Sequence, residues 1–313
     1  MRGMAAAFAA LLLGACTPAL EPRGPDIRPA RMTGEAFEMP DGATLPYRSW
    51  PSSSGAPKAV VLALHGFNDH SRAWTMPAQA WAGRGITTYA YDQRGFGRSP
   101  HPGIWSGTDS LVADLADAFA LVRDRHADAP VFVAGESMGG AVAMAAIAHG
   151  RIGAVHGTVL VAPAVRGRST LTIFERWGLA LLYATVPGIA PTVSVPGVQA
   201  SDNIEMLREL SADPLFLKRT RVDTLKGLVD LMDESLAAGP AIGGATLVLL
   251  GAQDTLVPSG PTATMLASMP PAPPADRTVV TYRAGYHMLL RDRQRGRAID
   301  DVANWILART EPR

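Results

Sequence analysis

The chain has 313 residues, of which 47% are hydrophobic and 18% charged, enough apolar material for a sizeable globular core. A formal net charge of +1, with no basic run interleaved with aromatic residues, argues against nucleic acid as a partner. The single cysteine excludes an intrachain disulfide, and no cysteine–histidine cluster has zinc spacing, so we expect neither a metal nor a cofactor.

The N-terminus predicts export followed by lipidation. After a short basic start, residues 4–13 form an apolar stretch that is too short to span a bilayer and is typical of a secretory signal peptide. The stretch ends in the letters LGAC, which resemble the lipobox of bacterial lipoproteins, with Cys16 as the last residue. This resemblance implies removal of residues 1–15 and attachment of diacylglycerol to Cys16. The alternative is a plain secretory signal, cleaved after Ala15, with an accidental cysteine.

A lipid on Cys16 would hold the mature chain on a membrane of the bacterial cell envelope, because each buried CH₂ of an acyl chain contributes about 0.8 kcal/mol. No aspartate follows the cysteine directly, which resembles sorting to the outer membrane, on its periplasmic side. Residues 16–32 are rich in proline, arginine and glycine, a composition that predicts a flexible tether.

A globular domain is predicted over residues 33–310, and it opens with strands. Residues 33–50 predict two strands joined by a turn at positions 40–42. Residues 59–64 are continuously apolar, which is typical of a strand buried on both faces of a parallel sheet. The loop that follows contains His65 and His70, which we interpret as residues that shape the loop rather than as catalytic bases.

Short helices and strands then alternate. The predicted elements are helix 71–84, strand 86–91, helix 108–126, a strand from residue 131, and strand 158–162. Asp92 ends one of these strands within a glycine-rich stretch, which favours a turn with local charge pairs over a catalytic acid.

Ser137 lies in the letters GESMG, between an apolar strand and an alanine-rich helix. In this context the G-x-S-x-G pattern predicts a sharp turn that places the serine in a strained conformation and exposes its hydroxyl above the sheet edge. The alternative is an ordinary turn between strand and helix with an incidental serine. A serine nucleophile requires a histidine base and an acid that orients the base.

Regular alternation breaks at residue 165, and the next convincing strand, 245–250, comes after a long interruption. The interruption contains an apolar helical segment, a stretch broken by proline and glycine, and an amphipathic pattern over residues 215–236. We interpret residues 165–238 as a cap over the site. Its apolar side chains either line a pocket for an acyl chain or simply pack the core.

The acid and the base are expected after the cap. Asp254 follows strand 245–250 directly, and His287 lies in a loop between the last strand, 279–282, and a terminal helix over about 294–309. The order Ser137, Asp254, His287 is that of the α/β-hydrolases.

Two backbone N–H groups are expected to stabilise the oxyanion. In proteins with this serine turn, one donor follows the serine, here Met138, and the other comes from the loop after an earlier strand, here Phe67. Such donors typically contribute about 3–4 kcal/mol each in the transition state.

Together these segments resemble α/β-hydrolases of the monoacylglycerol lipase and lysophospholipase type, also grouped as serine aminopeptidase S33-like hydrolases. The resemblance implies a mostly parallel sheet flanked by helices, with a helical cap. Phe67 departs from the small residue common at its position in monoacylglycerol lipases. The matching stretches are residues 65–71, 92–99, 135–140, 251–254, 257–258 and 286–287, with a further likeness at 213–214.

The predicted activity is hydrolysis of carboxylic esters by Ser137, His287 and Asp254, with a small acyl ester as substrate. Monoacylglycerol and lysophospholipid are the substrates that the resemblance implies. The alternatives are an acyltransferase or a peptidase with the same residues, or a catalytically idle lipoprotein that binds a lipid.

Overall fold

The computed structural model describes residues 17–153, 155–192, 197–271 and 276–310. The predicted signal peptide over residues 1–15 and the predicted lipidation site, Cys16, lie outside these ranges. Among the described residues, no helix is both long enough and apolar enough to cross a bilayer.

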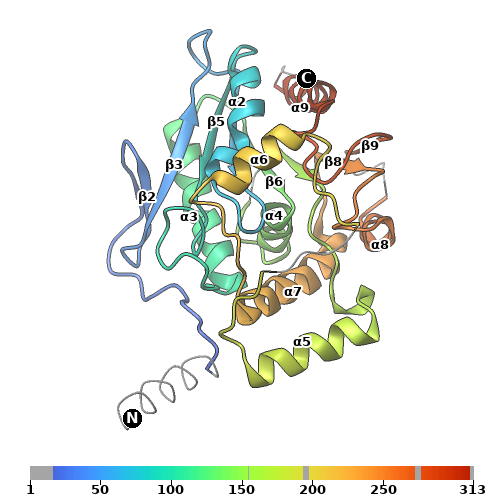
Figure 1. The fold of residues 1–313 in the computed structure, drawn as a ribbon. Coiled ribbons are helices and arrows are strands. Elements are labelled where there is room, and N and C mark those ends of the chain that lie inside the picture. Colours follow the sequence, from blue (N-terminus) through green and yellow to red (C-terminus); the bar gives the residue numbers. More distant parts are fainter. Residues whose placement is uncertain (1–16, 154, 193–196, 272–275, 311–313) are drawn as a thin grey trace.

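A single sheet forms the centre of the described chain (Figure 1). Its nine strands lie in the order β1-β2-β3-β5-β4-β6-β7-β8-β9. The pairs among β1, β2, β3 and β5 are antiparallel, and all the later pairs are parallel. The strands are β1 (Arg31–Met32), β2 (Ala36–Glu38), β3 (Thr44–Trp50), β4 (Ala59–Leu64), β5 (Ile86–Tyr91), β6 (Val131–Glu136), β7 (Gly157–Val161), β8 (Thr246–Gly251) and β9 (Arg277–Tyr282).

Helices cover both faces of this sheet. The α-helices are α2 (Thr75–Ala82), α3 (Thr108–Arg125), α4 (Met138–Ala148), α5 (Ile173–Thr185), α6 (Ile204–Ala212), α7 (Val222–Ala237), α8 (Ser259–Ser268) and α9 (Arg295–Leu307). Short 3₁₀ turns are η1 (Ser71–Trp74), η2 (Arg168–Thr170) and η3 (Gly239–Ala241). Helices α3, α4 and α7 pack on one face, and α2 and α9 pack on the other.

Strand β4 shows why the continuous apolar run of residues 59–64 was needed. Its side chains alternate between the two faces: Val60 and Leu62 enter the core beneath α3 and α4, whereas Val61 and Ala63 enter the core beneath α2 and α9. Every residue of β4 is buried. Both cores therefore depend on a strand with no polar side, as expected for a parallel sheet covered on both faces.

The helix predicted over residues 71–84 begins as a 3₁₀ turn, η1, before α2 starts at Thr75. Pro77 has no backbone N–H to donate within the first turn of α2, which favours a change of helix type at this point. Helices α6 and α8 were not predicted; they are only nine and ten residues long.

The segment predicted as a flexible tether is bound to the domain. The Ala19 N–H donates to Asp223 Oδ2 at the start of α7 over 2.9 Å, and Arg23 binds Asp117 of α3 over 2.6 Å. Further along, β1 adds a strand to the sheet edge. The prediction of a flexible tether fails over the described residues, because a carboxylate on α7 accepts a backbone N–H of this segment and a carboxylate on α3 pairs with its arginine. We call residues 17–30 the N-terminal strap.

The insertion between β7 and β8 begins and ends differently from the predicted cap of residues 165–238. Helix α7 packs its buried residues against α4, and the Ser235 hydroxyl donates to the Ala164 carbonyl over 2.6 Å. Helix α7 is thus part of the layer that covers the sheet. The part outside this layer runs from η2 to the end of α6 and contains α5, which lies against α7 (Figure 1).

Candidate active site

Ser137 occupies a strained turn between β6 and α4. Its φ of 53° and ψ of −115° form a combination that residues with a Cβ adopt rarely, at a cost of about 1–3 kcal/mol. Three backbone hydrogen bonds hold the turn: the Ser137 N–H donates to the Val161 carbonyl, and its carbonyl accepts from Ala141 and Ala164. The serine expected from the GESMG letters is therefore at the carboxyl end of a central strand, in the predicted conformation.

The two glycines beside Ser137 permit a very close approach of α4 to the sheet. A Cβ on Gly139 would overlap the Leu64 carbonyl of β4, and a Cβ on Gly135 would overlap the Gly139 backbone. Any larger residue at either position would push α4 away from β4 and β6. The glycines of the motif thus permit α4 to pack closely against β4 and β6.

His287 and Asp254 meet at the same edge of the sheet. The His287 Nδ1 atom lies 2.7 Å from Asp254 Oδ2, and both side chains are largely buried. The other carboxylate oxygen, Oδ1, accepts the backbone N–H groups of Leu256 and Val257, over 2.8 and 3.0 Å. With its carboxylate fixed by two backbone donors, Asp254 can hold the imidazole of His287 in one orientation, with Nε2 as the remaining ring nitrogen.

The predicted oxyanion donors flank the serine. Met138 is the first residue of α4. The loop that carries Phe67 approaches Ser137 so closely that a Cβ on Gly66 would lie 3.4 Å from the serine Cβ. The Phe67 ring packs edge-on against Phe96, with ring centroids 5.5 Å apart, so the side chain is fixed by a neighbouring loop.

The other candidate residues have structural roles. His65 is buried and donates from Nδ1 to the Gly66 carbonyl, while Nε2 accepts the Gln93 N–H. Burial lowers the pKa of His65, so the ring is held neutral in the loop that it shapes. The Asp92 carboxylate accepts backbone N–H groups of Ser71 and Arg98, in agreement with its interpretation as a turn residue.

Sequence reasoning missed a buried cation that joins three loops of the site. Arg291, four residues after His287, donates from Nη1 to Asp69 and from Nη2 to Glu136, each over 2.7 Å. Asp69 belongs to the loop of Phe67, and Glu136 directly precedes Ser137. All three charged side chains are buried. The only signal in the sequence was an arginine placed directly after an apolar run.

Burial and charge oppose one another in this cluster. Burial alone would lower the pKa of Arg291, but the carboxylates of Glu136 and Asp69 raise it instead. Burial raises the pKa of Glu136 above its usual range in spite of the nearby guanidinium. Arg291 is therefore a permanent cation on which two buried carboxylates depend.

The insertion contacts both loops of the site. The Leu217 N–H, after α6, donates to the carbonyl of Asn68, next to Phe67. Before α6, the carbonyl of Ala200 accepts the N–H of Met288, next to His287. The segments on either side of α6 thus bind the two loops that flank Ser137, and they connect any movement of the insertion to the site.

Asp292 strengthens the second of these connections. Its Oδ1 accepts the Ser201 hydroxyl over 2.6 Å, and its Oδ2 accepts the Tyr286 N–H over 2.8 Å. Burial raises the pKa of Asp292 to about 6, although both hydrogen bonds oppose that shift. Because Tyr286 precedes His287, this carboxylate fixes the backbone of the histidine loop to the insertion.

Comparison with known proteins gives one family. A family model described as serine aminopeptidase, S33, matches residues 55–294. The chain is 24% identical to monoacylglycerol lipase of Mycolicibacterium smegmatis, covering 87% of this chain and 96% of the relative. It is 27% identical to human monoglyceride lipase, covering 86% and 89%.

Solved structures agree on the fold. A monoglyceride lipase of Saccharomyces cerevisiae, solved as a soluble variant with a substrate analogue, superimposes with a TM-score of 0.74 at 17% identity, covering 92% of this chain and all of the other. Monoacylglycerol lipase of Paleococcus ferrophilus gives 0.70 at 19% identity, covering 85% and 99%. These neighbours and the mostly parallel sheet confirm the predicted α/β-hydrolase fold.

The buried cation gives the first testable prediction. We expect Arg291→Met to lower the free energy of unfolding by about 3–5 kcal/mol, because it leaves two buried carboxylates without their cation. Arg291→Lys keeps the positive charge, although an ammonium group lacks the planar fork that binds both carboxylates. We therefore expect Arg291→Lys to lower the free energy of unfolding by less than Arg291→Met does. Urea unfolding of the three proteins measures these differences.

The matched control is the double variant Arg291→Met with Glu136→Gln. Neutralising Glu136 removes one uncompensated charge, so part of the lost stability should return. A single Arg291→Met variant as stable as the wild type would show that the cluster does not hold the three loops together.

Proposed function

Because the chain belongs to the serine aminopeptidase S33 family of hydrolases, we propose that it cleaves carboxylic esters through an acyl-enzyme on Ser137. The observation that carries the proposal is the hydrogen bond between His287 and Asp254, on loops at the sheet edge where β6 delivers Ser137. This is the arrangement of side chains that serine hydrolysis requires.

In the acylation step, His287 takes the proton of the Ser137 hydroxyl and the serine oxygen attacks the ester carbonyl. Asp254 keeps the ring oriented and stabilises the imidazolium that forms. The N–H groups of Phe67 and Met138 hold the oxyanion of the tetrahedral intermediate. His287 then gives the proton to the departing alcohol.

Deacylation repeats these steps with water. His287 removes a proton from a water molecule, whose oxygen attacks the acyl carbon, and the returning proton releases Ser137 as a free hydroxyl. The carboxylic acid leaves as the second product. Atoms and charge balance across both steps with no other reactant.

The substrate class is proposed from the relatives and from the insertion. The relatives named above are described as monoacylglycerol or monoglyceride lipases. In the insertion between β7 and β8, Met206 and Leu210 of α6 line a cavity together with Asp69 of the loop that carries Phe67. Monoacylglycerols and lysophospholipids, each with one acyl chain and a polar head, fit this combination.

We also propose that the protein is a lipoprotein of the bacterial cell envelope. The LGAC letters that end at Cys16, after an apolar stretch of signal-peptide length, support this location. With the acyl chains of Cys16 in the outer membrane, the domain would face the periplasm and meet lipid substrates at the membrane surface.

The activity is tested with a panel of substrates. Purified wild type should hydrolyse a monoacylglycerol, a lysophospholipid and a soluble short-chain ester, and Ser137→Ala should lower kcat/KM on the order of 10⁴-fold or more. Ser53→Ala, which changes an exposed serine of a distant loop, is the matched control and should keep full activity. Free acid is measured by titration.

Three results would redirect this proposal. Retained esterase activity in Ser137→Ala would exclude Ser137 as the nucleophile. Product formation that depends on an added alcohol would indicate an acyltransferase, and cleavage of peptide amides in preference to esters would indicate a peptidase.

The lipid anchor has a separate test. Mass spectrometry of the mature wild-type protein should find an N-terminal Cys16 that carries diacylglycerol, while Cys16→Ser should keep the larger, uncleaved mass. A wild-type protein that begins after Ala15 with an unmodified thiol would mean a plain secretory signal.

A further inference from the structure

Asn68 has a rarely adopted backbone conformation directly beside Phe67, the residue expected to donate to the oxyanion. Its φ is 64°, in the left-handed region that residues with a Cβ seldom adopt. The Asp69 N–H donates to the Gly66 carbonyl over 3.2 Å, which closes a four-residue turn with Phe67 and Asn68 in its two central positions. Of these two, only Asn68 has a positive φ, as the third residue of a type II turn requires.

The shape of this turn depends on Asn68. In a type I turn the third residue has a negative φ, and the peptide group between the two central residues is rotated by about 180°. An Asn68 without support would adopt the negative φ for part of the time, and the turn that presents the Phe67 N–H beside Ser137 would then be distorted. An oxyanion donor is effective only when it is fixed in direction before the reaction.

The segment between α6 and α7 supports Asn68 at two atoms. We call residues 213–221 the return segment. The Leu217 N–H donates to the Asn68 carbonyl over 2.9 Å, and the Asn68 Nδ2 atom donates to Thr220 Oγ1 over 2.7 Å. Within the described chain, the buried Oδ1 of the same amide accepts no hydrogen bond, so the Thr220 hydroxyl is the one polar group that fixes this side chain.

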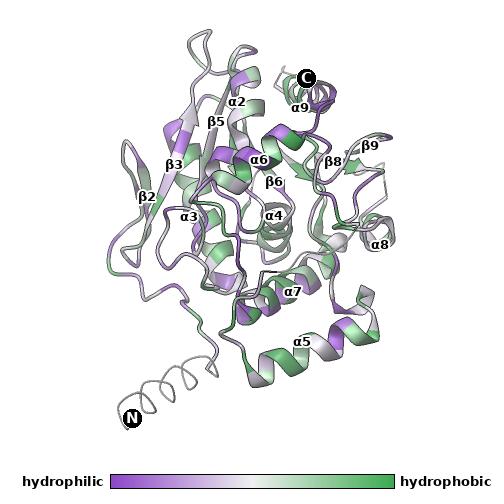
Figure 2. Ribbon diagram, viewed as in Figure 1, coloured by the Kyte–Doolittle hydropathy of each residue, from purple (hydrophilic) through white to green (hydrophobic). Residues whose placement is uncertain are grey.

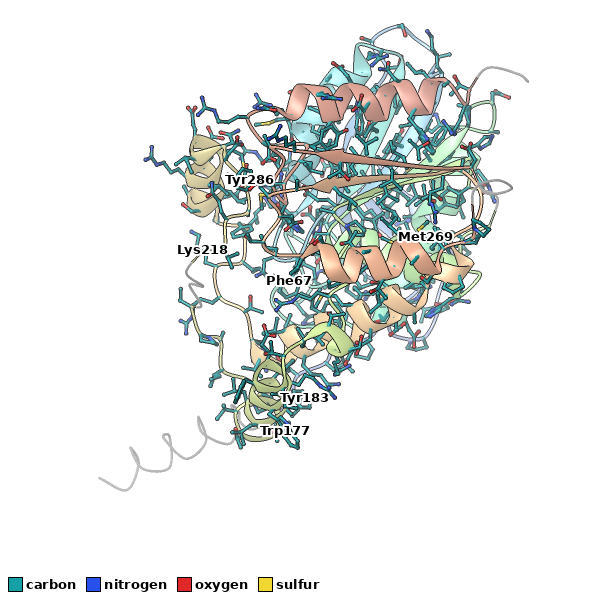
Figure 3. All side chains as sticks on the ribbon, turned by 90° about the vertical axis from the view of Figure 1, so that its right-hand side faces the viewer. Phe67, Trp177, Tyr183, Lys218, Met269 and Tyr286 are labelled. Carbon is teal, nitrogen blue, oxygen red and sulfur yellow. The ribbon has the colours of Figure 1, made fainter. Side chains whose placement is uncertain are left out.

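The return segment has no regular structure of its own, so its contacts with the loop determine its position. Figure 2 shows it as a connection without helix or strand that runs from the end of α6 to the start of α7. At its first residue, the Asp213 carboxylate lies 3.2 Å from His70 Nε2, at the far end of the same loop. Figure 3 shows Lys218 of the return segment farther out than Phe67 of the loop. The segment therefore covers the loop from outside.

We propose that Asn68 is a positioning residue, which the return segment holds in the left-handed conformation so that the Phe67 N–H stays directed at the oxyanion. The proposal rests on the proposed function, because it assigns a support to the oxyanion site of Ser137. It makes the insertion part of the catalytic apparatus. With the return segment in place both oxyanion donors are aligned, and with the segment displaced the turn relaxes and the Phe67 donor is lost.

Asparagine suits this position for two reasons. It adopts the left-handed conformation more readily than most residues with a Cβ. Glycine would adopt it at least as readily but carries no group that could bind the return segment. The amide of Asn68 therefore combines the required backbone conformation with a bond to the insertion, and substitutions can separate these two properties.

Steady-state kinetics on a soluble p-nitrophenyl ester of a short acid test the bond. Thr220→Val removes the hydroxyl that accepts from Asn68 and keeps a branched side chain of similar size. We expect kcat to fall about tenfold with KM within about a factor of two, because a misdirected donor weakens binding of the transition state alone. Thr220→Ser keeps the hydroxyl, and its kcat should stay within about a factor of two of the wild-type value.

Variants of Asn68 complete the series. Asn68→Gly keeps the left-handed conformation but lacks the amide, so its kcat should fall about as far as that of Thr220→Val. Because both variants break the same bond, the double variant should be no slower than either alone. Asn68→Ala loses the bond and also disfavours the conformation, so it should be the slowest. Lys218→Ala, at an exposed position of the return segment, is the matched control and should keep wild-type kinetics.

Two further measurements distinguish positioning from a general loosening of the fold. The inhibition constant of a trifluoromethyl ketone, whose adduct on a serine carries an oxyanion, should rise by about the same factor as kcat falls. The pH dependence of kcat/KM, which reports titration of the free enzyme's catalytic base, should stay unchanged. Thermal unfolding of each variant checks its fold, and if Asn68→Ala does not fold, the two variants of Thr220 decide the test.

A wild-type kcat in Thr220→Val would overturn the positioning role, and so would a KM that rises at unchanged kcat. The same conclusion would follow if the losses in Asn68→Gly and Thr220→Val multiplied in the double variant, because the two side chains would then act separately. A folded wild-type protein that does not hydrolyse the ester would instead overturn the proposed function, and with it this role of Asn68.

Discussion

The site depends on one close contact between backbones. Helix α4 begins so near to β4 that the Leu64 carbonyl occupies the space of a Cβ on Gly139, and this approach forces the turn between β6 and α4 to be sharp. Ser137 takes the resulting strain, with a positive φ that its three backbone hydrogen bonds maintain. A serine on a relaxed turn would lie deeper, in the layer between helix and sheet, where no substrate carbonyl could reach it.

The remaining parts of the site come from distant positions in the chain and need a common support. The Arg291 guanidinium provides it, because its bonds to Asp69 and Glu136 join the loop of Phe67 and the turn of Ser137 to the loop that follows His287. Asp292 on the same loop accepts a hydrogen bond from Ser201 and so joins this loop to the insertion. Arg291 and Asp292 thus connect the turn of Ser137, the loop of Phe67 and the insertion to one another. Because both residues lie on the loop of His287, a displacement of any of these segments would also displace His287.

Much of this could be predicted from sequence because local signals and global packing agree. The apolar run of β4, the glycines around Ser137, and the strand ends before Asp254 and His287 each have a local signature. The network of Arg291 has none, since its partners lie more than 150 residues away. The N-terminal strap was predicted as a tether from its composition, which cannot reveal that Asp223 of α7 binds its backbone and Asp117 of α3 binds the guanidinium of Arg23. Helix α6 is only nine residues long and was not predicted. The cap boundary was placed too late because α7, whose pattern is amphipathic, packs on α4 as a core helix.

The central claim is that the strained turn and the His287–Asp254 pair make Ser137 a nucleophile. Labelling of the native protein with a fluorophosphonate, followed by mass spectrometry of the peptides, tests it most directly. The account predicts a phosphonyl group on Ser137 alone, formed rapidly in wild type and far more slowly in His287→Gln. A folded wild-type protein that stays unlabelled, or that is labelled at another residue, would contradict it.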